Sequence, residues 1–143
     1  LFEFLTSLDQ QAVYFNQFVF GFQRQCDILI DAGNKLVIAE IKRASNAQNP
    51  FKQILEYLFY CLSSFRLHVD RLAPIKEIDL LLIIENGNKF LDLTEVKSFI
   101  KRCSKIENRE NIVIVPHTIT YEVSRGILTT RLCDLSLTDA SLD

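Results

Sequence analysis

The chain has 143 residues, of which 48% are hydrophobic and 24% are charged, with only four Gly and three Pro. This composition excludes intrinsic disorder and predicts one globular domain over residues 1–143. The formal net charge of −2 argues against a protein that holds nucleic acid by bulk positive charge. No apolar run is long enough to span a membrane and no signal peptide is visible, so we expect a cytoplasmic protein whose cysteines are buried free thiols.

The first part of the chain predicts a strand, a strand hairpin and a helix. Residues 1–8 have the pattern of the end of an amphipathic helix, and residues 12–22 are rich in Val, Phe and Tyr, which favours a strand. Residues 26–31 and 36–42 are β-prone segments on either side of a Gly-Asn turn. Asn49-Pro50 marks the start of a helix that reaches about Ser64, with an apolar stripe made of Phe51, Ile54, Leu55, Leu58, Phe59 and Leu62.

The second part continues the alternation of strands and helices. Residues 78–85 form an apolar run typical of a strand buried on both faces, which makes 36–85 a parallel strand–helix–strand unit. Residues 94–105 predict a helix with basic residues on its exposed side, and residues 111–115, 118–123 and 127–133 predict strands. We therefore expect an α/β domain with a mixed central β-sheet flanked by helices. Its core is 1–85, residues 86–133 add a helix and strands, and residues 134–143 form a frayed tail.

The hairpin brings three chemically active side chains to one face of the predicted sheet. If Gly33 and Asn34 form a two-residue turn, Asp27 lies directly opposite Glu40. Period-two alternation then places Lys42 on the same face. An odd-length turn without a bulge would send Glu40 and Lys42 to the other face.

Two carboxylates that are this close repel each other unless one is protonated or a cation lies between them. Because the strand around Glu40 is apolar and looks central, a charged pair within it needs a partner. Mg²⁺ or Mn²⁺, which prefers oxygen ligands, would relieve the repulsion. Such an ion would also activate water, while Lys42 would orient that water or neutralise a phosphate. The alternative is that Glu40 and Lys42 form a solvated edge-strand pair with Asp27 merely nearby.

The spacing of Asp27, twelve intervening residues and Glu40-Ile41-Lys42 resembles the core motif of the PD-(D/E)XK nuclease superfamily. Gln53 and Tyr57 are similar to the QxxxY element on the following helix of its RecB-like branches. The resemblance implies a restriction-endonuclease-like core and a Mg²⁺- or Mn²⁺-dependent deoxyribonuclease, most simply an endonuclease. In this family the metal ligands would be Asp27, Glu40 and the Ile41 carbonyl.

The same resemblance implies that Lys42 assists catalysis, that Gln53 lies near the active site to position phosphate or water, and that Tyr57 supports it. The alternative for Gln53 is a polar boundary residue, and for Tyr57 a packing role. No Pro precedes Asp27, which departs from the motif's name.

Other residues carry weaker signals. Glu3 matches an acidic residue that similar enzymes place on the first helix, and Arg24 matches a basic residue before the catalytic Asp, although both are equally ordinary as surface residues. Asp31 is placed to cap the turn. Basic residues are candidates for phosphate contacts around the site, and solvated helix faces are an equal alternative for them: Lys42, Arg43, Lys52, Lys97, Lys101, Arg102 and Lys105.

A chain of this size needs a partner to cut both strands of a duplex, which makes a homodimer on DNA a candidate assembly. The rival functions are a catalytically inactive nuclease-fold module that binds nucleic acid or protein, and an interaction domain with an unrelated α/β fold.

Overall fold

The computed structural model describes the backbone of residues 13–21, 24–67 and 75–134, and the side chains of 25–63 and 75–130. Within these ranges the elements in chain order are β1 (Val13–Gly21), β2 (Arg24–Asp31), β3 (Lys35–Lys42), α2 (Pro50–Leu67), β4 (Glu77–Glu85), α3 (Leu93–Glu110), β5 (Val113–Ser124) and β6 (Ile127–Asp134). The helix expected over 1–8 lies outside the described residues, as does the tail after Asp134.

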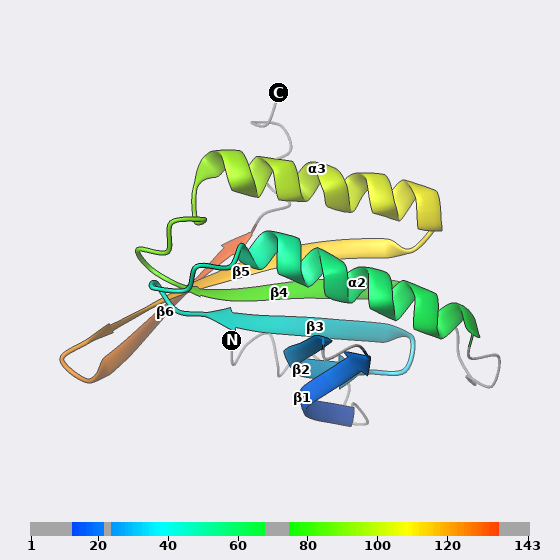
Figure 1. Cartoon of the computed structure of the whole chain (residues 1–143), viewed down its shortest axis with the longest axis horizontal. Coiled ribbons are helices and arrows are strands. Elements are labelled where there is room, and N and C mark those ends of the chain that lie inside the picture. The colour runs from blue at the N-terminus through cyan, green and yellow to red at the C-terminus, as the bar shows by residue number, and fades with distance from the viewer. Residues whose placement is uncertain (1–12, 22–23, 68–74, 135–143) are drawn as a thin grey trace.

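One sheet contains all six described strands, in the order β1-β2-β3-β4-β5-β6. Strands β3, β4 and β5 run parallel to one another, whereas β1–β2, β2–β3 and β5–β6 are antiparallel pairs. Helices α2 and α3 each connect two neighbouring parallel strands, and Figure 1 shows both on the same side of the sheet. The predicted α/β class with a mixed sheet and flanking helices is confirmed. Both described helices cover the same face.

The turn between β2 and β3 has the predicted register. Gly33 adopts a φ of +86°, a conformation that costs glycine little, and the Asp31 carboxylate accepts a hydrogen bond from the Gly33 amide. The Ala32 amide donates to the Lys35 carbonyl at 2.9 Å, which closes a two-residue turn. The pairs then run from Asp31 opposite Leu36 to Ile28 opposite Ala39. Both the register and the capping role of Asp31 were expected from the sequence.

Helix α2 begins where its cap predicts. The Asn49 side-chain oxygen accepts from the amides of Phe51 and Lys52, and Pro50 occupies the first helical position. Both helices extend beyond their expected ends, α2 to Leu67 and α3 to Glu110. The extension of α3 has a physical reason, because Ile106 continues its buried stripe and Asn111 closes it in the left-handed conformation.

The alternating side chains of β3 divide the core into two clusters. Leu36 and Ile38 pack beneath α2 and α3, whereas Val37 and Ala39 belong to a second cluster on the opposite face of the sheet. Because both faces are buried, β3 and β4 are apolar almost throughout. Cys26, Cys61 and Cys103 are buried free thiols, as expected.

Two expectations about the elements were wrong. Phe59 is not part of the buried stripe of α2, since 44% of it is exposed. The two strands expected over 111–115 and 118–123 are one continuous strand, β5, with Pro116 inside it. Proline is tolerated there because, among the described residues, pairing with β6 begins at His117 and the only strand paired with Pro116 is β4. Neither described helix has the length and apolarity needed to cross a membrane.

Candidate active site

The candidate site lies where β2 separates from β3. The last ladder pair is Ile28 opposite Ala39, and beyond it the Asp27 carboxylate accepts the Ile41 amide at 2.7 Å. The Asp27 amide in turn donates to Glu40 Oε2 at 3.4 Å. Cys26 packs in the cluster beneath the helices, although alternation from Leu29 would place it on the other face. The strand is therefore irregular at Asp27, whose side chain replaces a backbone acceptor.

Glu40 and Lys42 form a buried ion pair on the helix-covered face. Their exposed fractions are 4% and 5%, and Lys42 Nζ lies 3.2 Å from Glu40 Oε1. Lys42 Nζ also donates to Gln48 Oε1 at 3.3 Å. Since β3 is flanked by β2 and β4, the alternative of a solvated edge-strand pair is wrong.

Glu40 is a carboxyl group whose surroundings oppose its charge. Burial and then the nearby Asp27 carboxylate raise its pKa, Lys42 only partly offsets them, and the net pKa is about 7. At neutral pH the group is thus divided between its protonated and ionised forms. A cation placed against both carboxylates would favour the ionised form.

Helix α2 contributes a hydrogen-bonded pair one turn apart. Gln53 Nε2 donates to Tyr57 Oη at 2.7 Å, and Tyr57 Oη donates to the Gln25 carbonyl at 2.6 Å. Tyr57 is 1% exposed, and burial followed by the charge of Glu40 raises its pKa well above the ordinary value, so it remains a neutral phenol. The other amide atom, Gln53 Oε1, is buried and has no hydrogen-bond partner among the described residues.

The donor set fits a hard divalent cation. Asp27 and Glu40 supply carboxylate oxygens, and the Ile41 carbonyl points to the same strand edge as the Ile41 amide that Asp27 accepts. No group of three or more His, Cys, Asp or Glu side chains in the described ranges is arranged as a metal site. Mg²⁺ nevertheless commonly uses one or two carboxylates, keeps several waters and takes substrate phosphate as a further ligand.

The remaining predicted residues are placed as follows. Arg43 is exposed in the loop after β3, and Lys52 is exposed on the first turn of α2. Lys52 lines a cavity of about 190 Å³ beside the site, together with Gln48, Asn49, Gln53 and Glu56. The side chain of Arg24 and the whole of Glu3 lie outside the described parts of the chain.

Gln48 is a contact of Lys42 that sequence reasoning missed. It lies in the loop between β3 and α2, where the Asn46 side chain accepts the Gln48 amide at 2.9 Å. No periodic pattern covers such a loop, so the only available signal was its position between Lys42 and the cap of α2.

No protein-family model matches the chain, and no curated protein matches it in sequence. Among solved structures, Pyrococcus furiosus SfsA in complex with Ca²⁺ is similar, with a TM-score of 0.44 and 11% identity over 91% of this chain. The chain spans 57% of the length of that protein. A likeness of this extent concerns the course of the backbone alone.

Proposed function

We propose that this chain is a Mg²⁺- or Mn²⁺-dependent nuclease that hydrolyses phosphodiester bonds in DNA. One observation carries the proposal: the buried Glu40 carboxyl lies between Asp27 and Lys42, and its pKa of about 7 shows that one lysine does not compensate two carboxylates. An enzyme that needs a divalent cation at this point has a reason to keep such an unfavourable cluster.

The residues of the site have distinct tasks in this mechanism. Asp27 and Glu40 would hold the ion with the Ile41 carbonyl, and their positions are fixed by the Ile41 and Asp27 amides. When bound, the ion lowers the pKa of a water molecule and polarises a phosphoryl oxygen. The Lys42 ammonium, held between Glu40 and Gln48, neutralises charge that develops on the phosphate.

Gln53 is oriented to accept a hydrogen bond inside the site. Tyr57 fixes its Nε2, which leaves Oε1 buried and unpartnered in the described residues. An orphaned acceptor of this kind carries a desolvation cost that a bound water would remove. We assign Gln53 to positioning the attacking water, with Tyr57 holding the amide in place.

The test is cleavage of plasmid and branched DNA with Mn²⁺ or Mg²⁺, comparing the wild type with Glu40→Ala. We expect the variant to lose at least about 100-fold in rate while its circular dichroism spectrum is unchanged. Glu122→Ala, a matched change at an exposed glutamate of the same sheet, should cut at the wild-type rate. Cleavage of RNA with the same sequence, measured in the same assay, shows whether the site accepts ribose or deoxyribose.

A Glu40→Ala protein that cuts as fast as the wild type contradicts the assignment. If the wild type neither cuts nor gains thermal stability from Mg²⁺ or Mn²⁺, the chain is instead a nuclease-fold module for nucleic-acid or protein binding. The concentration dependence of double-strand cutting tests whether two copies act together on a duplex.

A further inference from the structure

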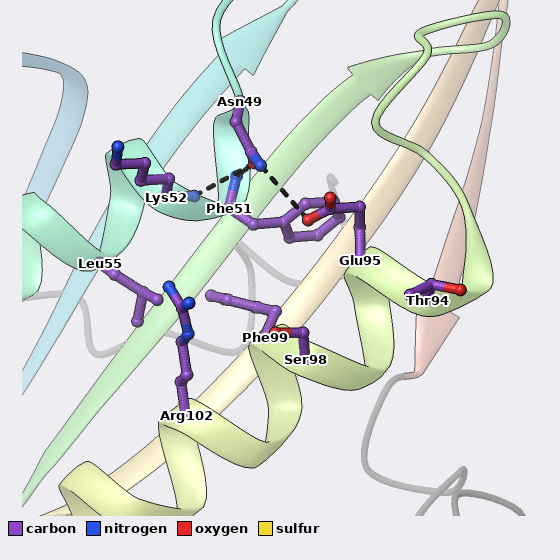
Figure 2. A pocket seen from close by; sticks show the side chains of 9 residues that line it. All are labelled: Asn49, Phe51, Lys52, Leu55, Thr94, Glu95, Ser98, Phe99 and Arg102. Atoms are coloured by element: carbon purple, nitrogen blue, oxygen red, sulfur yellow. Dashed lines mark hydrogen bonds between the residues drawn. The ribbon is translucent and has the colours of Figure 1, made fainter.

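A groove runs between α2 and α3 on the outer side of the helix layer. It consists of two adjoining cavities with volumes of about 300 and 400 Å³. Both cavities are lined by Lys52, Leu55 and Arg102. We call their combined surface the α2–α3 groove. Figure 2 shows the first cavity, where Arg102 extends from α3 toward α2 and lies beside Leu55.

The groove begins next to the candidate active site. Lys52 and Asn49 line its first cavity and also the cavity of about 190 Å³ that Gln48 and Gln53 line. Gln48 in turn accepts a hydrogen bond from Lys42 Nζ. A chain-like ligand whose phosphate lies at Lys42 therefore has a continuous path past Lys52 into the groove.

The charged residues that line the groove are four cations and two anions. Lys52 comes from α2, and Arg102, Lys105 and Arg109 come from α3, where spacings of three and four residues place them on one helical face. The acidic lining residues are Glu56 and Glu95. Glu95 Oε2 already accepts a hydrogen bond from Asn49 Nδ2 at 3.3 Å, which Figure 2 marks with a dashed line. The groove thus has local positive charge in a chain that is acidic overall.

The wider part of the groove also contains apolar surface. Leu55, Phe59 and Ile106 line it, and Phe59 is 44% exposed. The Arg109 guanidinium carbon lies 5.9 Å from the centre of the Phe59 ring, an arrangement that holds a flat aromatic face at the surface. Cationic side chains beside an exposed aromatic ring are the combination that binds single-stranded nucleic acid, through phosphates and stacked bases.

We propose that the α2–α3 groove binds a single-stranded segment of nucleic acid that continues from the scissile phosphate. The two adjoining cavities, of about 300 and 400 Å³, have room for a short stretch of one strand, whose unpaired bases can reach the exposed Phe59 ring as the paired bases of a duplex cannot. Arg102 and Arg109 are separated by a helical rise of about 10 Å, enough for several phosphates. The statement that the bound strand continues from the scissile phosphate rests on the proposed function. The binding of a single strand in the groove does not.

The test measures binding of a fluorescent oligothymidylate by anisotropy in EDTA, where no metal-dependent cleavage occurs. We expect Arg102→Glu/Lys105→Glu to weaken binding at least about tenfold and to reduce the slope of log K against log salt by about 1.4, since each phosphate contact contributes about 0.7. The matched control is Lys76→Glu/Lys89→Glu, which makes the same charge change at two exposed lysines that line neither cavity of the groove.

Two single substitutions test the groove by independent effects. Phe59→Ala should weaken binding by about fivefold or more with an unchanged salt slope, because stacking does not release counterions. Glu56→Gln should tighten binding at low salt, since it removes an anion from the groove. Unfolding midpoints equal to that of the wild type show that each variant is folded.

The proposal is overturned if the groove and control double variants bind alike, or if a duplex of equal length competes as well as the single strand. Unchanged single-strand affinity in the groove variant would instead favour an acidic peptide as the occupant. Because affinity is measured without metal, a wild type that binds but never cuts contradicts only the proposed function. A wild type that cuts while its groove variants bind normally contradicts only the groove.

Discussion

Each end of strand β3 carries a lysine that contacts a buried carboxylate. At one end Lys35 Nζ lies 2.8 Å from Asp79 Oδ2, and at the other Lys42 Nζ lies 3.2 Å from Glu40 Oε1. The two lysines are an odd number of positions apart, so they lie on opposite faces of the sheet. Asp79 and Glu40 are 1% and 4% exposed, which makes the two pairs a close comparison of similar groups.

The two carboxylates differ in the charge that surrounds them. Burial opposes ionisation of Asp79, but hydrogen bonds with His117, Glu77 and Lys35 hold its pKa below the ordinary value. For Glu40, burial and the Asp27 carboxylate outweigh Lys42 and raise the pKa to about 7. The groups around Asp79 therefore favour its ionised form, although Asp79 Oδ1 has no hydrogen-bond partner among the described residues, whereas around Glu40 one lysine does not balance burial and a second carboxylate. Under the proposed function, this difference distinguishes a stabilising ion pair from a cluster whose charge a bound cation would balance.

The largest expected effect is a difference in stability between substitutions of the two lysines. Lys35→Met should lower the free energy of unfolding at pH 7 by about 3 kcal/mol, because Asp79 then keeps its charge with less compensation. Lys42→Met should cost less stability, since Glu40 can take up a proton near neutral pH at little cost. Urea denaturation without metal measures both, and a larger loss in Lys42→Met would contradict the comparison.

The same two variants should have the opposite order in a cleavage assay. Lys42→Met should lose orders of magnitude in rate, while folded Lys35→Met should cut like the wild type, because Lys35 lies on the other face of the sheet.

The pH dependence of stability provides a second comparison. A carboxyl whose pKa is raised on folding stabilises the protein at low pH, and this contribution is lost as pH rises from 4.5, its ordinary value, through about 7. Glu40→Gln, which remains neutral, should therefore become more stable than the wild type over this range, by up to about 3 kcal/mol at pH 8 without metal. Asp79, with a lowered pKa, contributes above its ordinary value and loses that contribution in acid.

Thermal unfolding at pH 5 and pH 8 measures this difference. Added Mg²⁺ should raise the melting temperature of the wild type more than that of Glu40→Gln, because only the wild type retains both carboxylates. An equal difference between the two proteins at both pH values would show that Glu40 is not strained by its surroundings.

The smallest expected effect concerns the tyrosine that supports Gln53. Tyr57→Phe removes the hydroxyl that joins Gln53 Nε2 to the Gln25 carbonyl, and should cost about 1–2 kcal/mol of stability. It should also lower the cleavage rate, since the Gln53 amide is no longer fixed. Tyr121→Phe is the control in urea denaturation, because its hydroxyl makes a long 3.4 Å hydrogen bond to the Lys42 carbonyl. Equal stability losses in the two variants would show that the short hydrogen bonds of Tyr57 contribute no more to stability than the long hydrogen bond of Tyr121.

The sequence predicted the features that depend on local rules. The turn at Gly33, the period-two alternation and the Asn49 cap together placed Glu40 and Lys42 on one face of the sheet and α2 behind them. The roles assigned to Asp27, Glu40, Lys42 and Gln53 remain predictions. The element order also followed from pattern, except that two strands were expected over 111–115 and 118–123, where β5 is continuous.

The remaining features depend on contacts between distant segments. Asp79 lies within an apolar run, and its partners Lys35 and His117 come from the strands on either side. Similarly, Lys52 and Arg102 share a cavity only because α2 and α3 lie next to each other. A single sequence contains no signal for such pairings, since loop length and helix packing decide them.

The first residues of β5 show how the sheet limits unwanted association. Within the described residues, its ladder with β6 starts at His117, which pairs with Asp134. The Val113 amide donates a hydrogen bond inward to the Lys76 carbonyl, and the Ile114 amide donates to Glu107 Oε1 of α3 at 3.0 Å. Pro116 has no amide hydrogen. By alternation from Val113, the positions that face outward are Ile114 and Pro116, and neither offers a free amide donor, which disfavours pairing of this edge with another chain.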